Sequence, residues 1–373
     1  MRDLKDVMAI INDTAHKQSL KELTFHRSLS AMPTAGRYRI VDFALSNMAN
    51  SKIRNIGILT QSKNRSLIDH VRAGEEWDLI SKRAGLFILP PMRMSDNFLS
   101  EEGDIYTYYE HLDYIKRSRQ KQVIIYANDI VCNINLSEFV DFHKNSGADI
   151  TVLYTLRDKK YREKHTLIET DDKEQVIDMA INTENAFSNK EALGIYIMDK
   201  KILIEIIENC HARGLGSLEM DGFVKNINKY KIMGFKWLGY YMRINSIRNF
   251  FNHNMDLLNP DIWKELFFKS GLIYTKVRNE PPAKYTNNSK VSNSLIANGC
   301  VIEGTVENSV LFRGVKICKG ATVRNSIIMQ MGIIGERASL RYAILDKQAI
   351  VFAGKQLRGD KHYPVIVEKK ARI

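Results

Sequence analysis

The sequence predicts two structural parts: an α/β domain with a mostly parallel sheet over residues 1–275, and a linker followed by a parallel β-helix over residues 276–373. Three observations lead to this division. Up to residue 240, short runs rich in β-branched residues alternate with amphipathic stretches, which is typical of strands joined by crossover helices. From Glu307 onward, apolar residues recur every 17 residues. Proline and asparagine interrupt both patterns in residues 276–290 (KVRNEPPAKYTNNSK), where we expect the boundary.

Apolar runs predict the strands of the α/β part. They cover residues 7–11, 56–60, 123–126, 150–154 and 194–198. Between them, residues 105–117 have helical spacing, with the apolar side chains on one face. Ligands of parallel sheets bind beyond the carboxyl ends of the strands. We therefore expect a binding site in the loops that follow Ile11, Thr60 and Tyr126.

The C-terminal repeat can be written as three lines of 17 residues, ENSVLFRGVKICKGATV, RNSIIMQMGIIGERASL and RYAILDKQAIVFAGKQL. Within each line the apolar positions step by six, six and five, and residues 292–306 form a shorter preceding line. This spacing is typical of a parallel β-helix, in which each coil buries its apolar row against the next. Such repeats also occur in acyltransferases that use a histidine base. No histidine occurs in residues 254–361, which argues against acyl transfer.

The overall composition is that of a globular, cytoplasmic protein. The chain has 373 residues, of which 44% are hydrophobic and 26% charged. No apolar run approaches the ~20 residues of a membrane-spanning helix, and the N-terminal MRDLKDVMAI lacks a signal-peptide core. Cys132, Cys210, Cys300 and Cys318 form no CxxC pair, so we expect free thiols rather than a zinc site or a disulfide framework.

The chain is basic, with 55 Lys and Arg against 43 Asp and Glu and a net charge of +12. Such a surplus is typical of proteins whose partners are nucleic acid, an anionic membrane or small phosphorylated ligands. The basic clusters at residues 116–121 (KRSRQK) and 157–164 (RDKKYREK) are short. No zinc finger, RNP motif or basic heptad array accompanies them, so solvated surface segments are the simpler interpretation.

Six sequence blocks, in order, make the chain resemble one enzyme family. They are GRYRIVDFALSN from Gly36, IGILTQ from Ile56, GIYI from Gly194, NMDLL from Asn254, PPAK from Pro281 and ENSVLF from Glu307. Together they closely resemble bacterial glucose-1-phosphate adenylyltransferase, which makes ADP-glucose for glycogen, and the resemblance extends from about residue 8 to residue 357. It implies a Rossmann-like nucleotidyltransferase domain followed by a left-handed β-helix. It also implies a tetramer that uses Mg²⁺, ATP and glucose 1-phosphate and responds to anionic regulators.

The resemblance also shows where the phosphate-binding residues of the family are replaced. The family has a loop GGxGxRL, whose glycines let backbone N–H groups approach a triphosphate. Here the loop reads TAHKQSL, with Ser19 in place of the arginine. The lysine of the family's R-x-K-P motif corresponds to Leu29, and the lysine that holds the sugar phosphate corresponds to Asn182.

The metal-binding aspartates of the family are likewise incomplete. Its LSGDH motif corresponds to residues 126–130 (YANDI), which keep Asp129. The second aspartate, counted back from NMDLL, corresponds to Arg243, and a guanidinium cannot ligate Mg²⁺. Gln61 matches the position that reads adenine in the family. We therefore expect Gln61 and Asp129 to be the remnant of a nucleotide site. No cofactor or metal is expected on this chain, and Mg²⁺ is expected in a catalytic partner.

These replacements make the chain resemble the D-type regulatory subunit of the family. The hypothesis is a catalytically silent chain that joins a catalytic glucose-1-phosphate adenylyltransferase subunit in a heterotetramer, with no nucleic-acid or membrane partner. Arg37 matches a family lysine associated with anionic activators, and Arg39 follows it, so both are candidates for binding phosphorylated effectors. The alternative is that both are ordinary surface cations. Two other functions stay open: a weakly active sugar-1-phosphate nucleotidyltransferase and a stand-alone nucleotide-sugar sensor.

Overall fold

The computed structural model describes residues 4–14, 20–60, 62–80, 84–92, 103–157, 166–181 and 187–373. Its contacts divide the chain into two compact units. The first contains Met1–His16, Phe43–Tyr241 and Lys269–Tyr274, and the second contains Lys17–Asp42, Met242–Phe268 and Thr275–Ile373. The last segment of the second unit thus begins next to the predicted boundary at residue 276. Two earlier segments, which sequence analysis assigned to the α/β part, group with it.

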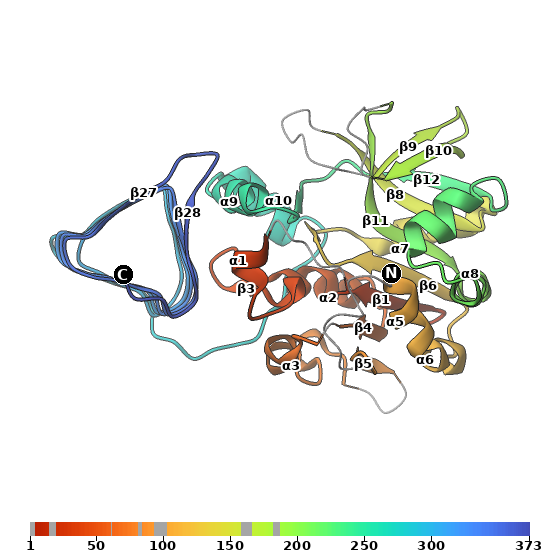
Figure 1. Cartoon of the computed structure of the whole chain (residues 1–373), viewed down its shortest axis with the longest axis horizontal. Helices are drawn as coiled ribbons and strands as arrows, with labels where there is room; N and C mark the ends of the chain where they lie inside the picture. The colour runs from red at the N-terminus through yellow and green to blue at the C-terminus, as the bar shows by residue number, and fades with distance from the viewer. Residues whose placement is uncertain are drawn as a thin grey trace. The chain divides into compact units, whose positions relative to one another are not determined.

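Among the described residues of the first unit, nine strands form one sheet (Figure 1). Its main path runs β10-β9-β11-β6-β1-β4-β5, and β8 pairs with both β11 and β12. The strands are β1 (Val7–Asn12), β4 (Asn55–Leu59), β5 (Gly85–Leu89), β6 (Gln122–Ala127), β8 (Ile150–Leu156), β9 (Thr166–Thr170), β10 (Val176–Ile181), β11 (Lys190–Asp199) and β12 (Ile232–Lys236). All five predicted strands are present. β1 pairs in parallel with β4 and β6, and β4 with β5, whereas β11 is antiparallel to its neighbours.

Helices accompany this sheet in the first unit. They include α3 (Arg65–Val71), α5 (Asp104–Glu110), α6 (Leu112–Arg117), α7 (Leu136–Ser146) and α8 (Lys200–Ala212). The apolar faces of α5, α6 and α8 share one core cluster with the strands of the sheet, and α7 contacts β8, β11 and β12. The predicted helix over residues 105–117 is two helices, because His111 leaves helical geometry at φ −105° and ψ 18°. Its ring Nε2 lies 2.8 Å from the carbonyl oxygen of Pro90, a contact that the sequence does not reveal.

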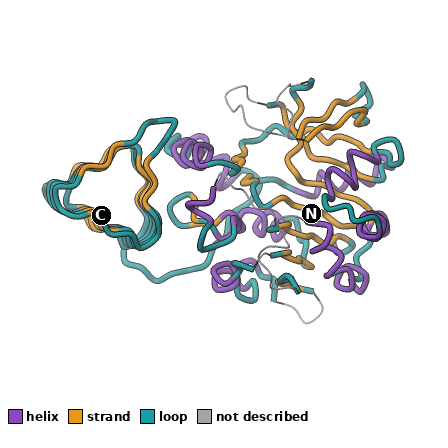
Figure 2. Tube along the Cα trace, in the orientation of Figure 1, coloured by secondary structure: helices purple, strands orange, loops and turns teal. Residues whose placement is uncertain are grey.

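The β-helix of the second unit consists of three parallel sheets of five strands each, seen end-on as a triangle in Figure 2. The first sheet contains β14 (Lys284–Tyr285), β17 (Val301–Ile302), β20 (Lys316–Ile317), β23 (Ile333–Ile334) and β26 (Ile350–Val351). The second contains β15 (Lys290–Ser292), β18 (Thr305–Glu307), β21 (Thr322–Arg324), β24 (Ser339–Arg341) and β27 (Gln356–Arg358). The third contains β16 (Leu295–Ile296), β19 (Val310–Leu311), β22 (Ile327–Ile328), β25 (Ala343–Leu345) and β28 (Val365–Val367).

The strand register confirms the 17-residue period. Ile317 pairs with Ile334, which pairs with Val351, and the equivalent apolar rows of the other two sheets behave in the same way. The shorter first coil is also confirmed, since Val306 pairs back to Val291. β14 and β15 begin within the predicted linker, so the β-helix starts earlier than the Pro and Asn residues suggested.

The corners between the second and third sheets repeat one backbone conformation. Asn293, Asn308 and Asn325 have positive φ values of 39°, 46° and 45°. Asparagine tolerates this left-handed conformation better than most residues, so the sequence favours a sharp corner at each of these positions. Beyond each corner a serine continues the pattern: Ser309 Oγ accepts a hydrogen bond from Ser326 N, and Ser326 Oγ accepts one from Ala343 N, both at 3.1 Å.

The remaining helices of the second unit are α1 (Lys21–Thr24), α9 (Ile247–Asp256) and α10 (Pro260–Phe268). The Phe267 ring packs 4.8 Å from that of Tyr38 and 4.1 Å from that of Trp263, measured between centroids. Helix α2 (Ile40–Asn50) begins in this unit and continues into the first. No helix in the described part of the chain combines the length and the apolar composition that crossing a membrane requires. All four cysteines are free thiols, as the sequence predicted.

Candidate functional site

The carboxyl ends of β1, β4 and β6 lie side by side in the first unit, where a site was predicted. Asn12, the last residue of β1, pairs with Leu59 of β4 and with Ala127 of β6. The residues that follow these strands are Asp13, Thr60 and Asn128, all at most 4% exposed. Asn128 Nδ2 donates to Asp13 Oδ1. Buried carboxylate and amide groups, without a cationic side chain at these three positions, therefore occupy the edge of the sheet.

Asp104 extends this polar site from α5. Its Oδ2 accepts a hydrogen bond from Asn12 Nδ2, and its Oδ1 accepts one from the backbone N–H of Leu218, both at 2.9 Å. Burial, with a smaller effect of the nearby Glu219 carboxylate, raises the pKa of Asp104 from 3.8 to about 6, although the hydrogen bonds from Leu218 and Asn12 oppose the shift. Tyr196 donates its hydroxyl to Glu219. The carboxyl group of Asp104 therefore exchanges its proton just below neutral pH.

A second site lies in the second unit, where cationic side chains gather around the β2–β3 hairpin (Pro33–Thr34 and Tyr38–Arg39). The turn between these strands has positive φ at Ala35 (51°) and Gly36 (78°), which glycine allows at little cost. Asn254 Oδ1 fixes the turn by accepting the N–H of Ala35 at 3.0 Å. The turn exposes Arg37, whose guanidinium donates to the hydroxyl of Tyr38 at 3.0 Å.

Two groups of cations include residues of this hairpin, one through Arg37 and one through Arg39, and we call them together the cationic cluster. Its members are Arg27, Arg37, Arg39, Arg278, Arg313, Lys347 and Lys369. Burial, together with the nearby charges of Arg39 and Arg27, lowers the pKa of Lys347 to about 6, while Asp346 opposes the shift. Burial also lowers the pKa of Arg313, which lies near Arg278 and Arg37 and pairs with Glu280 at 3.4 Å. The carboxylates that act on Arg313 and Lys347 are Glu280, Asp42 and Asp346, which are fewer than the cations of the cluster.

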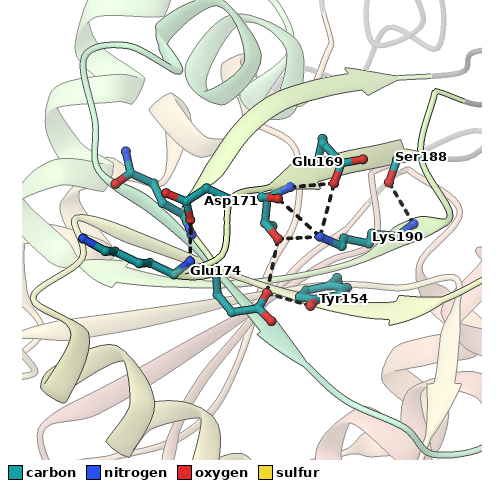
Figure 3. A network of polar contacts seen from close by, with 9 residues as sticks. Tyr154, Glu169, Asp171, Glu174, Ser188 and Lys190 are labelled. Carbon is teal, nitrogen blue, oxygen red and sulfur yellow. Dashed lines mark hydrogen bonds and ion pairs between the residues drawn. The ribbon is translucent and has the colours of Figure 1, made fainter.

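A polar network joins the β9–β10 hairpin of the first unit to β8 and β11 (Figure 3). The hydroxyl of Tyr154 donates to Glu174 Oε2 at 2.7 Å. The hydroxyl of Thr170 lies 3.3 Å from the same oxygen and 2.5 Å from Lys190 Nζ, which also donates to Glu169 Oε1 at 3.2 Å. Burial first, and then the hydrogen bond to Glu174, raise the pKa of Tyr154. Since the polar side chains of this network are hydrogen-bonded to one another, the network holds the β9–β10 hairpin against β8 and β11.

Comparison with known proteins identifies the family. Residues 18–238 match the nucleotidyl transferase family, and residues 281–363 match the GlmU-like, C-terminal hexapeptide family. The chain is 35% identical to "Glycogen biosynthesis protein GlgD" of Bacillus subtilis over 97% of this chain and 96% of that protein. It is 30% identical to "Glucose-1-phosphate adenylyltransferase" of Bacillus mycoides over 93% of each chain. The chain belongs to the glucose-1-phosphate adenylyltransferase family. A second GlgD protein, from Geobacillus stearothermophilus, is 38% identical over 97% of this chain and 96% of its own length, which confirms the predicted D-type resemblance.

The structure places some of the positions at which this family member departs from the family motifs. Leu29 lies in a 3-10 helix (Leu29–Ala31) of the second unit and is 3% exposed. Arg243 ends β13 (Tyr241–Arg243) and is half-buried. Asp129 follows β6 and is 4% exposed. Ser19, Gln61 and Asn182 lie outside the described residues.

The described residues do not supply both carboxylates that the resemblance implies for Mg²⁺. Within the described part of the chain, no three His, Cys, Asp or Glu side chains lie close enough together to hold a metal ion. One expected carboxylate, Asp129, remains, whereas Arg243 occupies the other position. Mg²⁺ usually takes one or two carboxylates along with the phosphates it neutralises, and a guanidinium repels it.

Sequence reasoning missed Asp13, Asp104 and Lys347. Asp13 could have been predicted from the sequence, because it lies two residues after the predicted strand of residues 7–11, in a loop where a site was expected. Asp104 and Lys347 depend on contacts between distant segments: Asp104 with Asn12, and Lys347 with Arg27 and Arg39. No local pattern signals either one.

Proposed function

We propose that this chain is a cytoplasmic, regulatory and catalytically silent subunit of glucose-1-phosphate adenylyltransferase in glycogen biosynthesis. A catalytic subunit would join it in a heterotetramer, bind Mg²⁺, and convert ATP and glucose 1-phosphate to ADP-glucose and pyrophosphate. One observation carries the proposal: Leu29, where the family has a lysine, is buried at 3% exposure. An apolar side chain cannot neutralise phosphate charge, and its burial shows that the surrounding core packs it as an apolar residue.

The replacement at Arg243 supports the same proposal. Its guanidinium cannot coordinate the metal that offsets charge on the reacting phosphates. Removing one preorganised electrostatic group raises a catalytic barrier by roughly 3–4 kcal/mol in enzymes where this has been measured. Loss of the phosphate loop, one lysine and one metal ligand together should leave little turnover, although these effects do not add linearly.

A pyrophosphate-release assay tests the proposal. The purified chain should release no pyrophosphate above background from ATP, glucose 1-phosphate and Mg²⁺, while a glucose-1-phosphate adenylyltransferase from the same organism is active. Co-expressed, the two should co-elute, and the kinetics of the complex should differ from those of the catalytic subunit alone. Robust turnover by the chain alone would contradict catalytic silence and favour the alternative of a weakly active sugar-1-phosphate nucleotidyltransferase. Separate elution with ADP-glucose binding to the lone chain would favour the sensor.

The cationic cluster is the proposed site for phosphorylated effectors, with Arg37 and Arg39 as its first contacts. Arginine can hold a phosphate through two hydrogen bonds, and Lys347 adds an amine held close to Arg39 and Arg27. Because the pKa of Lys347 is about 6, this amine is mostly neutral at pH 7.5. A bound dianion would raise that pKa, so binding of an effector should draw a proton from solution.

Calorimetry in buffers of different ionisation enthalpy measures this proton. With the complex and a sugar bisphosphate as probe, we expect uptake of up to one proton per site at pH 7.5. Lys347→Met should abolish the uptake, and Arg37→Ala should weaken binding about tenfold or more. Lys284→Met, which removes an exposed lysine of β14, should change neither quantity. Binding by Lys347→Met with undiminished proton uptake would contradict this site.

A further inference from the structure

The second sheet of the β-helix carries an arginine row on its outer face. Each strand of this sheet has three residues, and the middle ones of β18, β21 and β24, which are Val306, Val323 and Leu340, are buried in the β-helix core. The third residues of β21, β24 and β27 are Arg324, Arg341 and Arg358, and they pair with one another in register. All three are exposed. In-register strands lie about 4.8 Å apart, so the three arginine side chains leave the sheet at that spacing.

The charges of this arginine row are only partly offset. Glu307, one coil earlier, accepts a hydrogen bond from Arg324 Nε at 2.8 Å. Within the described chain, Arg341 and Arg358 have no ion pair, and Arg341 lies 5.4 Å from the ring centroid of Tyr342. Asp360, close in sequence to Arg358, accepts the backbone N–H of His362 at 2.9 Å. Like charges placed opposite one another destabilise a sheet, so the row works against folding. Like charges that lie side by side without enough neighbouring carboxylates to offset them are typical of binding surfaces.

We infer that the arginine row docks onto an acidic row of the catalytic partner subunit, on the coils of that subunit's own β-helix. This inference rests on the proposed function. The pitch supports it, because any β-helix repeats its outward side chains at the same spacing of about 4.8 Å. Carboxylates on successive partner coils would therefore meet successive arginines. The first residues of the same strands, Thr322, Ser339 and Gln356, lie beside the arginines and supply hydrogen-bonding groups.

Two other occupants fit this surface less well. A second copy of the chain offers one carboxylate, Glu307, at the equivalent positions, so it cannot match three arginines. Single-stranded nucleic acid would need aromatic side chains on which bases stack. The outward positions of β18, β21, β24 and β27 carry Thr, Ser, Gln, Glu and Arg side chains. An acidic protein surface is the occupant that matches both charge and pitch.

Charge reversal on the full-length chain tests the inference. Affinity for the glucose-1-phosphate adenylyltransferase of the same organism is measured by calorimetry at 50 and 200 mM salt. Arg341→Glu with Arg358→Glu should weaken binding at least tenfold and reduce its salt dependence. The control, Lys284→Glu with Lys316→Glu, makes the same charge change at exposed positions of another sheet and should stay within twofold. Arg341→Gln with Arg358→Gln should weaken binding in the same way but to a smaller degree. Both variants of the arginine row should have a melting temperature no lower than that of the wild type.

Each outcome decides something definite. Unchanged affinity in both arginine variants, with a normal complex of the wild-type chain, would overturn the docking row and leave the regulatory proposal intact. Equal losses in the arginine and lysine variants would overturn it in favour of unspecific charge attraction. If a labelled single-stranded oligonucleotide binds the wild type but not the arginine variants, the surface serves nucleic acid. If the wild-type chain forms no complex, the proposed function itself fails.

Discussion

At the scale of single residues, the stability of the second unit depends on a buried pair of opposite charges. Arg27 and Asp346 form an ion pair with side chains 3% and 1% exposed. The pair joins the segment Lys17–Asp42 to a coil of the β-helix within this unit. Asp346 also accepts the backbone N–H of Lys347 at 2.6 Å. A buried charge of this kind tolerates removal of its partner poorly.

Arg27→Met should therefore lower the free energy of unfolding by about 3–5 kcal/mol, because it leaves the Asp346 carboxylate buried and unpaired. Arg27→Met combined with Asp346→Leu should lose much less, since both charges are then gone. Urea denaturation of the two variants measures this difference. If the double variant were as unstable as the single one, packing rather than charge would explain the loss.

Asp104 should make the stability of the first unit depend on pH. Its pKa is 3.8 when solvated and about 6 in the folded chain, so the folded state holds the proton more tightly. The free energy of unfolding should then fall as pH rises from about 4 to 6, by up to about 3 kcal/mol, and stay lower above pH 6. Asp104→Asn should remove this fall. Asp172→Asn, at an exposed turn, is the matched control, and an unchanged profile in Asp104→Asn would exclude Asp104 as its source.

These residues mark the limit of sequence reasoning. Asn12 and Asp104 are 92 positions apart, and Arg27 and Asp346 are 319 apart. Their contacts depend on how whole segments pack, and neither periodicity nor spacing encodes that. Leu29 and Arg243, in contrast, could be singled out beforehand, because each occupies a fixed position in a family motif.

At the scale of elements, the coil pattern was predictable because it is local. A buried residue recurs at every coil, and the sequence displays it directly in the rows of Leu311, Ile328 and Leu345. The first coil was harder to see, because β14 and β15 contribute few buried side chains. The break between α5 and α6 was also hidden, since the apolar face continues through it while His111 turns to Pro90.

The serine pattern at the corners should contribute measurably to stability. Ser326 Oγ donates to the carbonyl of Arg324 at 2.7 Å and accepts the N–H of Ala343 at 3.1 Å, in a buried position. Ser326→Ala should cost about 1–3 kcal/mol, because the N–H of Ala343 loses its acceptor out of reach of water. Ser339→Ala, at an exposed strand position, should change stability by less than about 0.5 kcal/mol. Equal effects in thermal denaturation would contradict this role.

At the scale of the whole molecule, the net charge of +12 has several sources. Part lies in the cationic cluster, part in the arginine row, and part where a carboxylate of the family is replaced, as at Arg243. The division into two units, with residues 17–42 in the second, was not predictable, because it depends on long-range contacts. The positive charge is therefore divided among separate groups of side chains, as the proposed effector site and the proposed docking row require.

Restoring single groups should not restore the activity of the family. Ser19→Arg with Arg243→Asp returns one cation and one metal ligand, but the phosphate loop still lacks its glycines. We expect turnover to stay at least about a hundredfold below that of a catalytic subunit, because one missing electrostatic group alone costs that much. The pyrophosphate-release assay on this variant measures it. Full activity would mean that the loop glycines are dispensable.

The 17-residue coils in the middle of the β-helix have one further consequence. Residues 308–324 and 325–341 offer equivalent apolar rows to their neighbours, since Val323 pairs with both Val306 and Leu340. A copy of one coil inserted between them would meet matching surfaces on either side. Duplication of the gene segment for one coil would therefore lengthen the domain by about 4.8 Å, and the added coil would bury the same apolar rows as its neighbours.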